Sequence, residues 1–315
     1  MKVAVIIPCY NVAAYVERAV RSAWEQQPLA LDLIAVDDGS TDATREVLQQ
    51  LMKERPGMLR LITCAHAGAS AARNTGLAAT DARYIQFLDA DDVLMPGKIA
   101  GQLALAAHHG GPSLIAGGYR NMWPDGRIQD VSPGSDPWLA VIDGRAGTTS
   151  ANLWSRAAVV EAGGWDEQLA SSQDHELVFR ILRNGGSYVV DPRIATGILK
   201  RSADSISRID PLGNWERYIA LRAAIRDHLV ATPMTRSVAA RAECDRRIFG
   251  AVRAVARGDM ARAMALHDRY LPHRYRPDTG PGVPQTYALV YRLFGLRVAE
   301  VTARAVGILR QLFHR

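Results

Sequence analysis

The chain has 315 residues, 48% of them hydrophobic and 22% charged, and its 38 basic and 32 acidic residues leave a net charge of +6. A chain of this length buries a sizeable core and suits one large α/β domain, or a catalytic domain with a smaller appendage, which excludes a disulfide-held miniprotein and a disordered tail. Its three cysteines lie far apart without metal-site spacing, so we expect neither a disulfide framework nor a zinc site, and a reducing cytoplasm as the compartment.

The first 92 residues alternate apolar runs with segments of helical periodicity. We expect strands at 3–7, 31–36, 59–63 and 84–88. We expect a helix at about 12–27, a second helix that begins after a cap at Thr41 or Asp42, and a third at 69–79. Repeated strand-helix-strand units of this kind predict a mostly parallel, doubly wound, Rossmann-like sheet with helices on both faces.

The middle of the chain is mixed, and its end is helical. Trp123-Pro124-Asp125-Gly126 is a turn signal that predicts a hairpin within 119–128, and the Gly/Pro/Ser-rich stretch 131–149 predicts a mobile loop. A helix at 174–183 and a strand at 187–190 follow. Beyond residue 211 the pattern is helical, with breaks near Pro233, Gly258 and 272–284.

Polar clusters end each strand of the first half. They are Tyr10-Asn11, Asp37-Asp38, Arg73-Asn74 and Asp89-Ala90-Asp91. Ligands of parallel sheets bind beyond the carboxyl ends of the strands, and converging carboxylates require a cation or a hydrogen-bonding ligand. An Asp-x-Asp triplet suits Mg²⁺ or Mn²⁺, but Asp91 or Asp92 could equally cap the helix that follows Pro96.

Taken together and in this order, the segments 4–11, 36–42, 71–76 and 87–92 resemble the family 2 glycosyltransferases of the A-type fold. The resemblance covers about residues 3–208. It implies a catalytic domain at 1–210, with a nucleotide-sugar-binding half at 1–112 and an acceptor-binding half at 113–210, followed by a basic helical region at 211–315.

The resemblance also implies a nucleotide diphosphate sugar as donor, most often a UDP-sugar, and Mn²⁺ or Mg²⁺ as cofactor. A tyrosine ring can stack on the base, a carboxylate can accept the imide proton of uracil, and a metal neutralises charge on the leaving diphosphate. The implied donor residues are Pro8, Tyr10, Asp37, Asp38, Arg73 and Asp89, with the metal on Asp91 and Asp89. The alternatives are that Tyr10 only packs its ring and that Arg73 only pairs with a carboxylate.

Residues 163–177 resemble the acceptor segment of the same family. There a Glu-Asp pair opens a helix and its Asp is the general base, so the resemblance assigns Asp174 as the base, although Gln173 departs from the usual Glu. An inverting displacement needs one carboxylate opposite the leaving group to take the hydroxyl proton. Trp165, Asp166 and Gln173 are the implied acceptor contacts. The alternative is that Asp174 is a helix N-cap.

A second departure lies at residues 200–207. Many family members have a His that can reach the metal or the diphosphate where this chain has Ser202. Lys200 or Arg201 could contact the diphosphate instead, and the alternative is a solvated basic turn.

The positive charge gathers at the C-terminal end. Residues 211–315 hold 18 Arg, no Lys and 8 acidic residues, hence +10, whereas residues 1–210 hold 20 basic and 24 acidic residues, hence −4. No zinc-finger spacing or aromatic RNA-binding motif accompanies the arginines, so we expect no nucleic-acid partner. Apolar residues and Arg alternate over 285–315, which suits either a helix on an anionic membrane surface or a helix packed on its own domain or on a homodimer partner.

We therefore predict an inverting, metal-dependent glycosyltransferase that acts on a glycan or lipid-linked acceptor, in the cytoplasm or peripherally on the inner membrane face. Residues 1–8 are too short an apolar run for a signal peptide, and no stretch matches the roughly 20 apolar residues of a spanning helix. A nucleotidyltransferase is disfavoured because no Gly-rich basic loop follows the first strand. A catalytically silent, nucleotide-binding or scaffold member of the family is the alternative.

Overall fold

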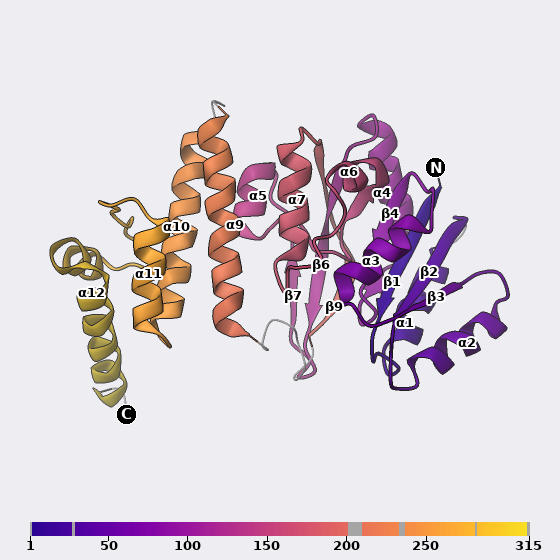
Figure 1. Ribbon diagram of the computed structural model, residues 1–315, viewed down its shortest axis with the longest axis horizontal. Coiled ribbons are helices and arrows are strands. Elements are labelled where there is room, and N and C mark those ends of the chain that lie inside the picture. Colours follow the sequence, from indigo (N-terminus) through magenta and orange to yellow (C-terminus); the bar gives the residue numbers. More distant parts are fainter. Residues whose placement is uncertain (1, 27–28, 201–209, 233–236, 281, 314–315) are drawn as a thin grey trace. The chain divides into compact units, whose positions relative to one another are not determined.

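The computed structural model describes residues 2–26, 29–200, 210–232, 237–280 and 282–313 (Figure 1). The chain divides into two compact units, which we call the N-terminal unit (Met1–Ile206) and the C-terminal unit (Ser207–Arg315). Each unit has its own packing, and each is described separately below.

The N-terminal unit is built on one nine-stranded sheet with the order β3-β2-β1-β4-β8-β6-β9-β5, in which β7 pairs with β6. The strands β1 to β4 pair in parallel with one another, as do β6 and β9, whereas β5, β7 and β8 run antiparallel to their neighbours. The predicted mostly parallel α/β sheet is confirmed. The strands are β1 (Val3–Cys9), β2 (Leu31–Asp38), β3 (Arg60–Cys64), β4 (Tyr84–Phe87), β5 (Val93–Leu94), β6 (Leu114–Met122), β7 (Ile128–Val131), β8 (Leu153–Ser155) and β9 (Tyr188–Leu199).

Helices connect these strands and lie on the sheet (Figure 1). They are α1 (Val16–Trp24), α2 (Thr44–Glu54), α3 (Ala69–Ala78), α4 (Lys98–His108), α5 (Pro137–Asp143), α6 (Arg156–Glu161) and α7 (Gln173–Arg183). The predicted hairpin is confirmed, since β6 and β7 pair across residues 123–127. Helix α1 begins later than the periodicity predicts because a turn, in which the Tyr15 N–H donates to the Val12 carbonyl (2.9 Å), precedes it.

The prediction of a mobile loop over 131–149 is wrong, because α5 lies inside this stretch. The Asp136 side chain accepts a hydrogen bond from the Leu139 N–H (3.0 Å) and caps the helix, and Pro137 occupies its first turn. Gly144 ends the helix in a left-handed conformation (φ 71°). Ala140, Val141 and Ile142 are buried and hold α5 against the rest of the N-terminal unit. Composition alone does not reveal this tertiary packing.

The C-terminal unit is helical, as predicted. It contains α9 (Pro211–Ala231), α10 (Ser237–Ala256), α11 (Met260–Tyr270) and α12 (Gln285–Phe313). The predicted breaks near Gly258 and at 272–284 are confirmed, whereas Pro233 lies outside the described residues. Helix α12 is interrupted at Gly295, whose backbone is left-handed (φ 79°).

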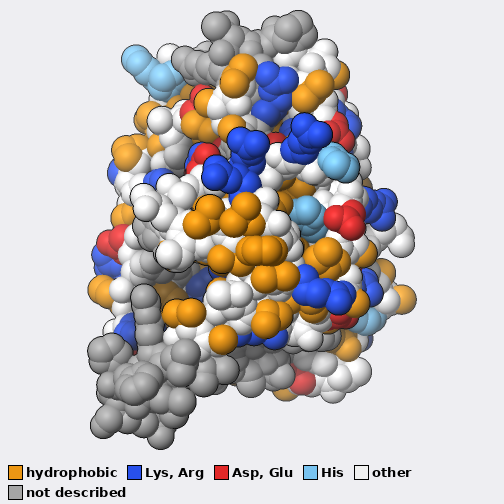
Figure 2. Space-filling view, turned by 90° about the vertical axis from the view of Figure 1, so that its left-hand side faces the viewer, with side chains coloured by type: hydrophobic (Ala, Val, Ile, Leu, Met, Phe, Trp, Pro, Cys, Tyr) orange, Lys and Arg blue, Asp and Glu red, His pale blue; other side chains and the backbone are white. Residues whose placement is uncertain are grey.

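Helix α12 has both buried and exposed apolar residues. Leu296 and Ala299 are buried in the core of the C-terminal unit. Six other apolar residues are 42–64% exposed, and we call them the α12 outer face: Leu289, Leu293, Phe294, Val298, Val301 and Val306. Figure 2 looks onto the side of Figure 1 where α12 lies and shows hydrophobic side chains gathered there with Lys and Arg side chains among them.

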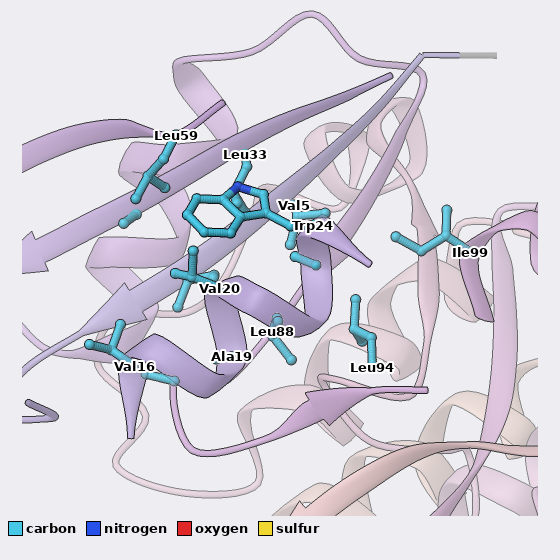
Figure 3. Packing of buried hydrophobic residues seen from close by; sticks show 14 of the residues in the cluster. Val5, Val16, Ala19, Val20, Trp24, Leu33, Leu59, Leu88, Leu94 and Ile99 are labelled. Atoms are coloured by element: carbon cyan, nitrogen blue, oxygen red, sulfur yellow. The ribbon is translucent and has the colours of Figure 1, made fainter. Parts of the chain in front are cut away.

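The core of the N-terminal unit fixes the edge of the sheet on which the polar clusters lie. Helix α1 packs Val20 and the Trp24 indole against Val5 of β1 and Leu33 of β2 (Figure 3). These side chains are at most 4% exposed, and burying each of them contributes roughly 1.5–3 kcal/mol to stability. The buried core therefore holds the first strands in register, so that their carboxyl ends meet.

Candidate active site

The turns after β1 and β2 are joined at the carboxyl edge of the sheet. Asn11 has a left-handed backbone (φ 51°), and its Oδ1 accepts a hydrogen bond from the Thr41 N–H (2.8 Å). Because β1 and β2 are parallel neighbours, this contact holds Tyr10 and the Asp37-Asp38 pair at one place on the sheet edge.

Asp37 is fully buried and supports the turn that follows β2. Its carboxylate accepts hydrogen bonds from the Ser40 N–H (3.0 Å) and from Arg45 Nε (2.9 Å). Burial by itself raises the pKa of Asp37, but the hydrogen bonds from Ser40 and Arg45 outweigh burial and lower that pKa below its ordinary value. The contacts of Asp37 are thus with the protein, and its side chain has no exposed surface.

Asp38 holds the segment between β3 and α3, and it brings His66 to Tyr10. Asp38 Oδ1 accepts from the Ala67 N–H (2.8 Å), and Oδ2 accepts from the Gly68 N–H (2.9 Å). His66 Nδ1 lies 2.9 Å from Asp38 Oδ2, and the His66 ring stacks on the Tyr10 ring with centroids 3.9 Å apart and planes 19° apart. The two residues expected to hold a base therefore lie together, and both contact His66.

Arg73 joins the donor residues to the acceptor residues. Its Nη2 donates to Asp89 Oδ1 (2.7 Å), and its Nη1 donates to Gln173 Oε1 (3.4 Å) at the start of α7. The guanidinium carbon lies 4.5 Å from the centroid of the Trp165 ring, and the side chain is almost fully buried. Arg73 does pair with a carboxylate, but it does so between the two halves of the predicted site.

Three aspartates, Asp89, Asp91 and Asp92, follow β4 and place three carboxyl groups at the sheet edge. Asp92 is buried; its Oδ2 accepts from the Ser150 hydroxyl (2.6 Å) and its Oδ1 from the Leu199 N–H (3.3 Å). Burial first, and then the charges of Asp89 and Asp91, raise the pKa of Asp92 well above its ordinary value. The alternative that Asp91 or Asp92 caps α4 is wrong, because that helix has Gly97 as its N-cap and no side-chain cap.

The carboxylates of Asp89 and Asp91 fit a metal ion that is bound together with a substrate. Among the described residues, no three His, Cys, Asp or Glu side chains converge as metal ligands. Mg²⁺ is commonly held by one or two protein carboxylates, with substrate phosphates and water completing its shell. Asp89 and Asp91 are partly buried, and their charges raise the pKa of the neighbouring Asp92. The two carboxylates match the donor set that Mg²⁺ uses when a substrate phosphate completes its shell.

Asn74 fixes the loop that precedes α7. Its Oδ1 accepts from the Trp165 N–H (2.8 Å), and its Nδ2 donates to the Trp165 carbonyl (2.9 Å) and to Glu167 (2.8 Å). The Trp165 indole is 2% exposed and packs edge-on against Phe87 at a centroid distance of 5.1 Å. In this structure Trp165 is therefore a core residue beneath Arg73 rather than a surface contact for an acceptor.

Asp174 lies in the first turn of α7 beside an imidazole. Helix α7 has Ser172 as its N-cap, so the alternative that Asp174 is the N-cap is wrong. Asp174 Oδ1 accepts a hydrogen bond from the His175 N–H (2.8 Å) and lies 3.0 Å from His175 Nδ1. Burial alone raises the pKa of Asp174, but His175, and then Arg73, lower it well below its ordinary value. The negative charge of Asp174, after burial, raises the pKa of Tyr119 on β6.

The remaining predicted residues lie around this group or outside the described part of the chain. Pro8 is half-buried on β1, in register with Val36. Asp166 accepts a hydrogen bond from the Gln168 N–H (2.8 Å). The Lys200 N–H donates to the Met122 carbonyl (2.9 Å), whereas residues 201 and 202, the predicted Arg201 and Ser202 contacts, lie outside the described ranges.

Sequence reasoning missed three residues of this site. His66 and Tyr119 stand in segments without a motif, so no local signal identifies them. The Ser150 hydroxyl donates a hydrogen bond to Asp92 and accepts one from the Asp89 N–H (3.0 Å). Ser150 lies 58 or more positions from both aspartates in the sequence. Only tertiary proximity reveals such partners.

Comparisons with known proteins show a family match over part of the chain. Residues 4–144 match the model of "Glycosyl transferase family 2". An uncharacterized glycosyltransferase of Nostoc is 42% identical over 99 residues, 31% of this chain and 31% of its own length. A putative teichuronic acid biosynthesis glycosyltransferase of Bacillus subtilis is 40% identical over 101 residues, 32% of this chain and 40% of its own length. The chain thus spans about a third of the length of these curated relatives.

Solved structures show the same fold at low sequence identity. The crystal structure of S. aureus TarS 1-349 in complex with UDP-GlcNAc matches 97% of this chain and 92% of its own, with a TM-score of 0.72 and 17% identity. A mannosyltransferase from Pyrobaculum calidifontis in complex with GDP-Man and Mn²⁺ matches 98% of this chain and 86% of its own, with a TM-score of 0.53 and 18% identity.

The ordered strand-end motifs, the mostly parallel sheet and the family match over residues 4–144 agree. Residues 4–144 match glycosyl transferase family 2, and the chain has the A-type glycosyltransferase fold that its sequence predicts.

Proposed function

We propose that this glycosyltransferase moves a sugar from a UDP-sugar to a hydroxyl of a glycan or lipid-linked acceptor, with inversion at the transferred carbon. Tyr10 and Asp38 would hold the base, Asp89 the ribose, and Asp174 would be the general base. Asp89 and Asp91 would hold Mn²⁺ or Mg²⁺, which supplies charge neutralisation for the departing diphosphate.

The observation that carries this proposal is the position of Arg73. One guanidinium reaches Asp89, a donor residue, and Gln173, the neighbour of the proposed base, and its positive charge also helps to lower the pKa of Asp174. An inverting transfer needs the donor and the base on opposite sides of one reacting carbon, within a few ångströms of each other. Arg73 supports this arrangement because it holds Asp89 and the residue next to Asp174 close together.

The chemistry follows from the ionisation of Asp174. Its lowered pKa keeps the carboxylate charged at neutral pH, so it can accept the proton of an acceptor hydroxyl as the hydroxyl oxygen bonds to the sugar carbon. The bond from that carbon to the diphosphate oxygen breaks in the same step, and its electron pair leaves with UDP. Arg73, beside the donor residues, can stabilise the growing negative charge.

The similar proteins support a saccharide product. TarS binds UDP-GlcNAc, and other relatives are named as a teichuronic acid biosynthesis enzyme, a chondroitin synthase and a hyaluronan synthase. On this basis we place the chain in the synthesis of an envelope polysaccharide.

We also propose that the protein works against an anionic membrane surface. No described helix is long and apolar enough to span a bilayer. The α12 outer face has no cover within the C-terminal unit as described, and the charged residues exposed beside it, Arg292, Arg297 and Arg304, are all basic. Self-association through this face would bring arginines of like charge together, whereas anionic lipid neutralises them, so lipid is the better partner.

The decisive experiment separates an enzyme from a silent nucleotide-binding or scaffold subunit, which Gln173 and Ser202 motivate. Asp174→Asn should lower transfer and donor hydrolysis by roughly 10²- to 10⁴-fold, the usual contribution of a general base, with the affinity for UDP retained. The matched control is Asp125→Asn, in the exposed turn between β6 and β7. A panel of nucleotide sugars with Mn²⁺, followed by release of the nucleotide, gives the readout.

Two outcomes would contradict these assignments. Loss of UDP binding in Asp174→Asn would move Asp174 to the donor site. A parent protein that neither binds nor hydrolyses any nucleotide sugar would leave the scaffold alternative.

A further inference from the structure

His66 makes both contacts that the proposed function assigns to a nucleobase. Its flat ring stacks on Tyr10, with a centroid separation of 3.9 Å and planes 19° apart, within the range of aromatic stacking. Its Nδ1 lies 2.9 Å from Asp38 Oδ2, the carboxylate expected to accept an imide proton. A uracil ring stacked on Tyr10 with its N–H toward Asp38 would make the same two contacts.

We propose that the His66 imidazole occupies the nucleobase position of the unliganded site and that a uracil base displaces it. This inference rests on the proposed function, because it takes Tyr10 and Asp38 to be the base-binding pair. It adds a residue that sets the donor affinity and defines the recognised chemistry as a flat ring with an N–H donor.

The architecture around Asp38 does not require the His66 contact. The backbone N–H groups of Ala67 (2.8 Å) and Gly68 (2.9 Å) already hold the two oxygens of Asp38, so the loop keeps its anchor when the imidazole leaves. Asp38 is 2% exposed, and the His66 imidazole is one of the groups that contact its Oδ2.

The imidazole is also free to move. The His66 side chain is 52% exposed, and Tyr10 is 43% exposed, so neither ring is locked in the core. Turning the ring outward gives up the stack on Tyr10 and the contacts of Nδ1 with Asp38 Oδ2 (2.9 Å) and the Asp38 carbonyl (3.2 Å). A base stacked on Tyr10 would regain the stack and the Oδ2 contact. Donor binding is therefore weaker than a vacant slot would give, by the free energy of the contacts that His66 loses.

The test compares UDP binding to the 315-residue protein and to its His66→Ala variant. Removing the competing ring should lower the dissociation constant of UDP, by about fivefold if the competitor is worth one ordinary net hydrogen bond. His109→Ala, at the C-terminal end of α4, is the matched control and should leave affinity unchanged. Tyr10→Ala, made in the His66→Ala background, should weaken UDP binding, because the stacking face is then lost.

A second measurement follows the ring directly. In the long-range ¹H–¹⁵N spectrum of the parent, the His66 imidazole signals should shift when UDP or UMP is added and stay unchanged with ribose 5-phosphate, which carries no base. His66→Ser provides a second variant without a ring, and it should bind UDP as tightly as His66→Ala.

The outcomes distinguish this inference from the function on which it rests. Weaker or unchanged UDP binding in both ringless variants overturns the displacement and makes His66 a supporting or neutral neighbour, while UDP binding by the parent upholds the donor site. If neither the parent nor the folded variants bind UDP, the proposed donor is wrong, and the inference fails with it.

Discussion

Two aspartates of this site have different pKa values because their surroundings differ. Asp92 is buried beside two other carboxylates and has a raised pKa, whereas Asp174 is partly buried beside His175 and Arg73 and has a lowered one. Burial penalises the charged form in both, and the neighbouring charges decide the direction. Asp174 is therefore held in its charged form, whereas the neutral form of Asp92 is favoured.

The metal assignment can be tested at Asp91. If Asp91 is a ligand, Mn²⁺ should strengthen UDP binding to the parent, and Asp91→Ala should remove most of that gain, since one of two protein carboxylates is lost. Titration calorimetry with and without Mn²⁺ provides the measurement, with Asp81→Ala, which is exposed and paired with Lys2, as the control. Equal affinity with and without Mn²⁺ in the parent would exclude this role.

The neighbouring imidazole should set how acid-resistant the reaction is. A lowered pKa keeps Asp174 ionised as pH falls, so its basic form is present above that value and is lost only below it. His175→Phe keeps a ring of similar size but removes the Nδ1 contact, so the pKa of Asp174 should rise and the acid limb of kcat/KM should move up by about one pH unit. Profiles of kcat/KM that extend well below pH 4 check this, with His108→Phe as control; an unmoved acid limb would contradict it.

At the scale of elements, α3 and the loop before α7 behave as one unit because Asn74 connects them. Helix α3 lies close to β1, where a Cβ at Gly76 would collide with Ile6. Asn74, two residues earlier, then binds both backbone polar groups of Trp165. The loop that carries Trp165 and Glu167 is therefore fixed to the helix that carries Arg73.

The hydrogen bonds between Asn74 and Trp165 should contribute to the free energy of unfolding. Asn74→Ala leaves the Trp165 N–H and carbonyl without their partners and should lower the free energy of unfolding by about 2 kcal/mol. Urea unfolding gives the value, and Asn184→Ala, at the exposed end of α7, should change it little. A loss as small as that of the control would show that water replaces the Asn74 contacts.

For the whole molecule, the net charge of +6 is the sum of two opposite parts. The first 210 residues carry −4 and the last 105 carry +10. The acidic part collects the carboxylates of the site, and the basic part carries the α12 outer face with its arginines. Charge on this scale governs association with surfaces rather than the fold.

Vesicle binding tests the membrane partner. The full-length protein should sediment with vesicles containing phosphatidylglycerol and stay in solution with pure phosphatidylcholine, and salt should weaken the binding because the Debye length falls to roughly 10 Å at 0.1 M. Leu293→Ser with Phe294→Ser should reduce binding, and Leu212→Ser on α9 should not. If the protein does not bind anionic vesicles but dimerises through the α12 outer face, its partner there is a second copy of the chain.

The local part of this architecture was readable from the sequence. Apolar runs and helical periodicity determine β1 to β4 and the helices between them, because these elements pack through their own pattern of side chains. The longer β9 was not predictable: its pairing with β6 continues past Pro192 through register shifts at Gly117 and Gly118, and a partner strand 70 residues away decides that.

The sequence by itself determined the family, the order of the motifs and the side chains at the strand ends, because these depend on residues adjacent in the chain. Only the tertiary structure decided which of them meet: Arg73 with Asp89 and Gln173, Tyr10 with His66, and Trp165 in the core instead of on the surface. The physical reason is that ion pairs, ring stacks and burial depend on distances in space, which folding sets between residues as far as 107 positions apart.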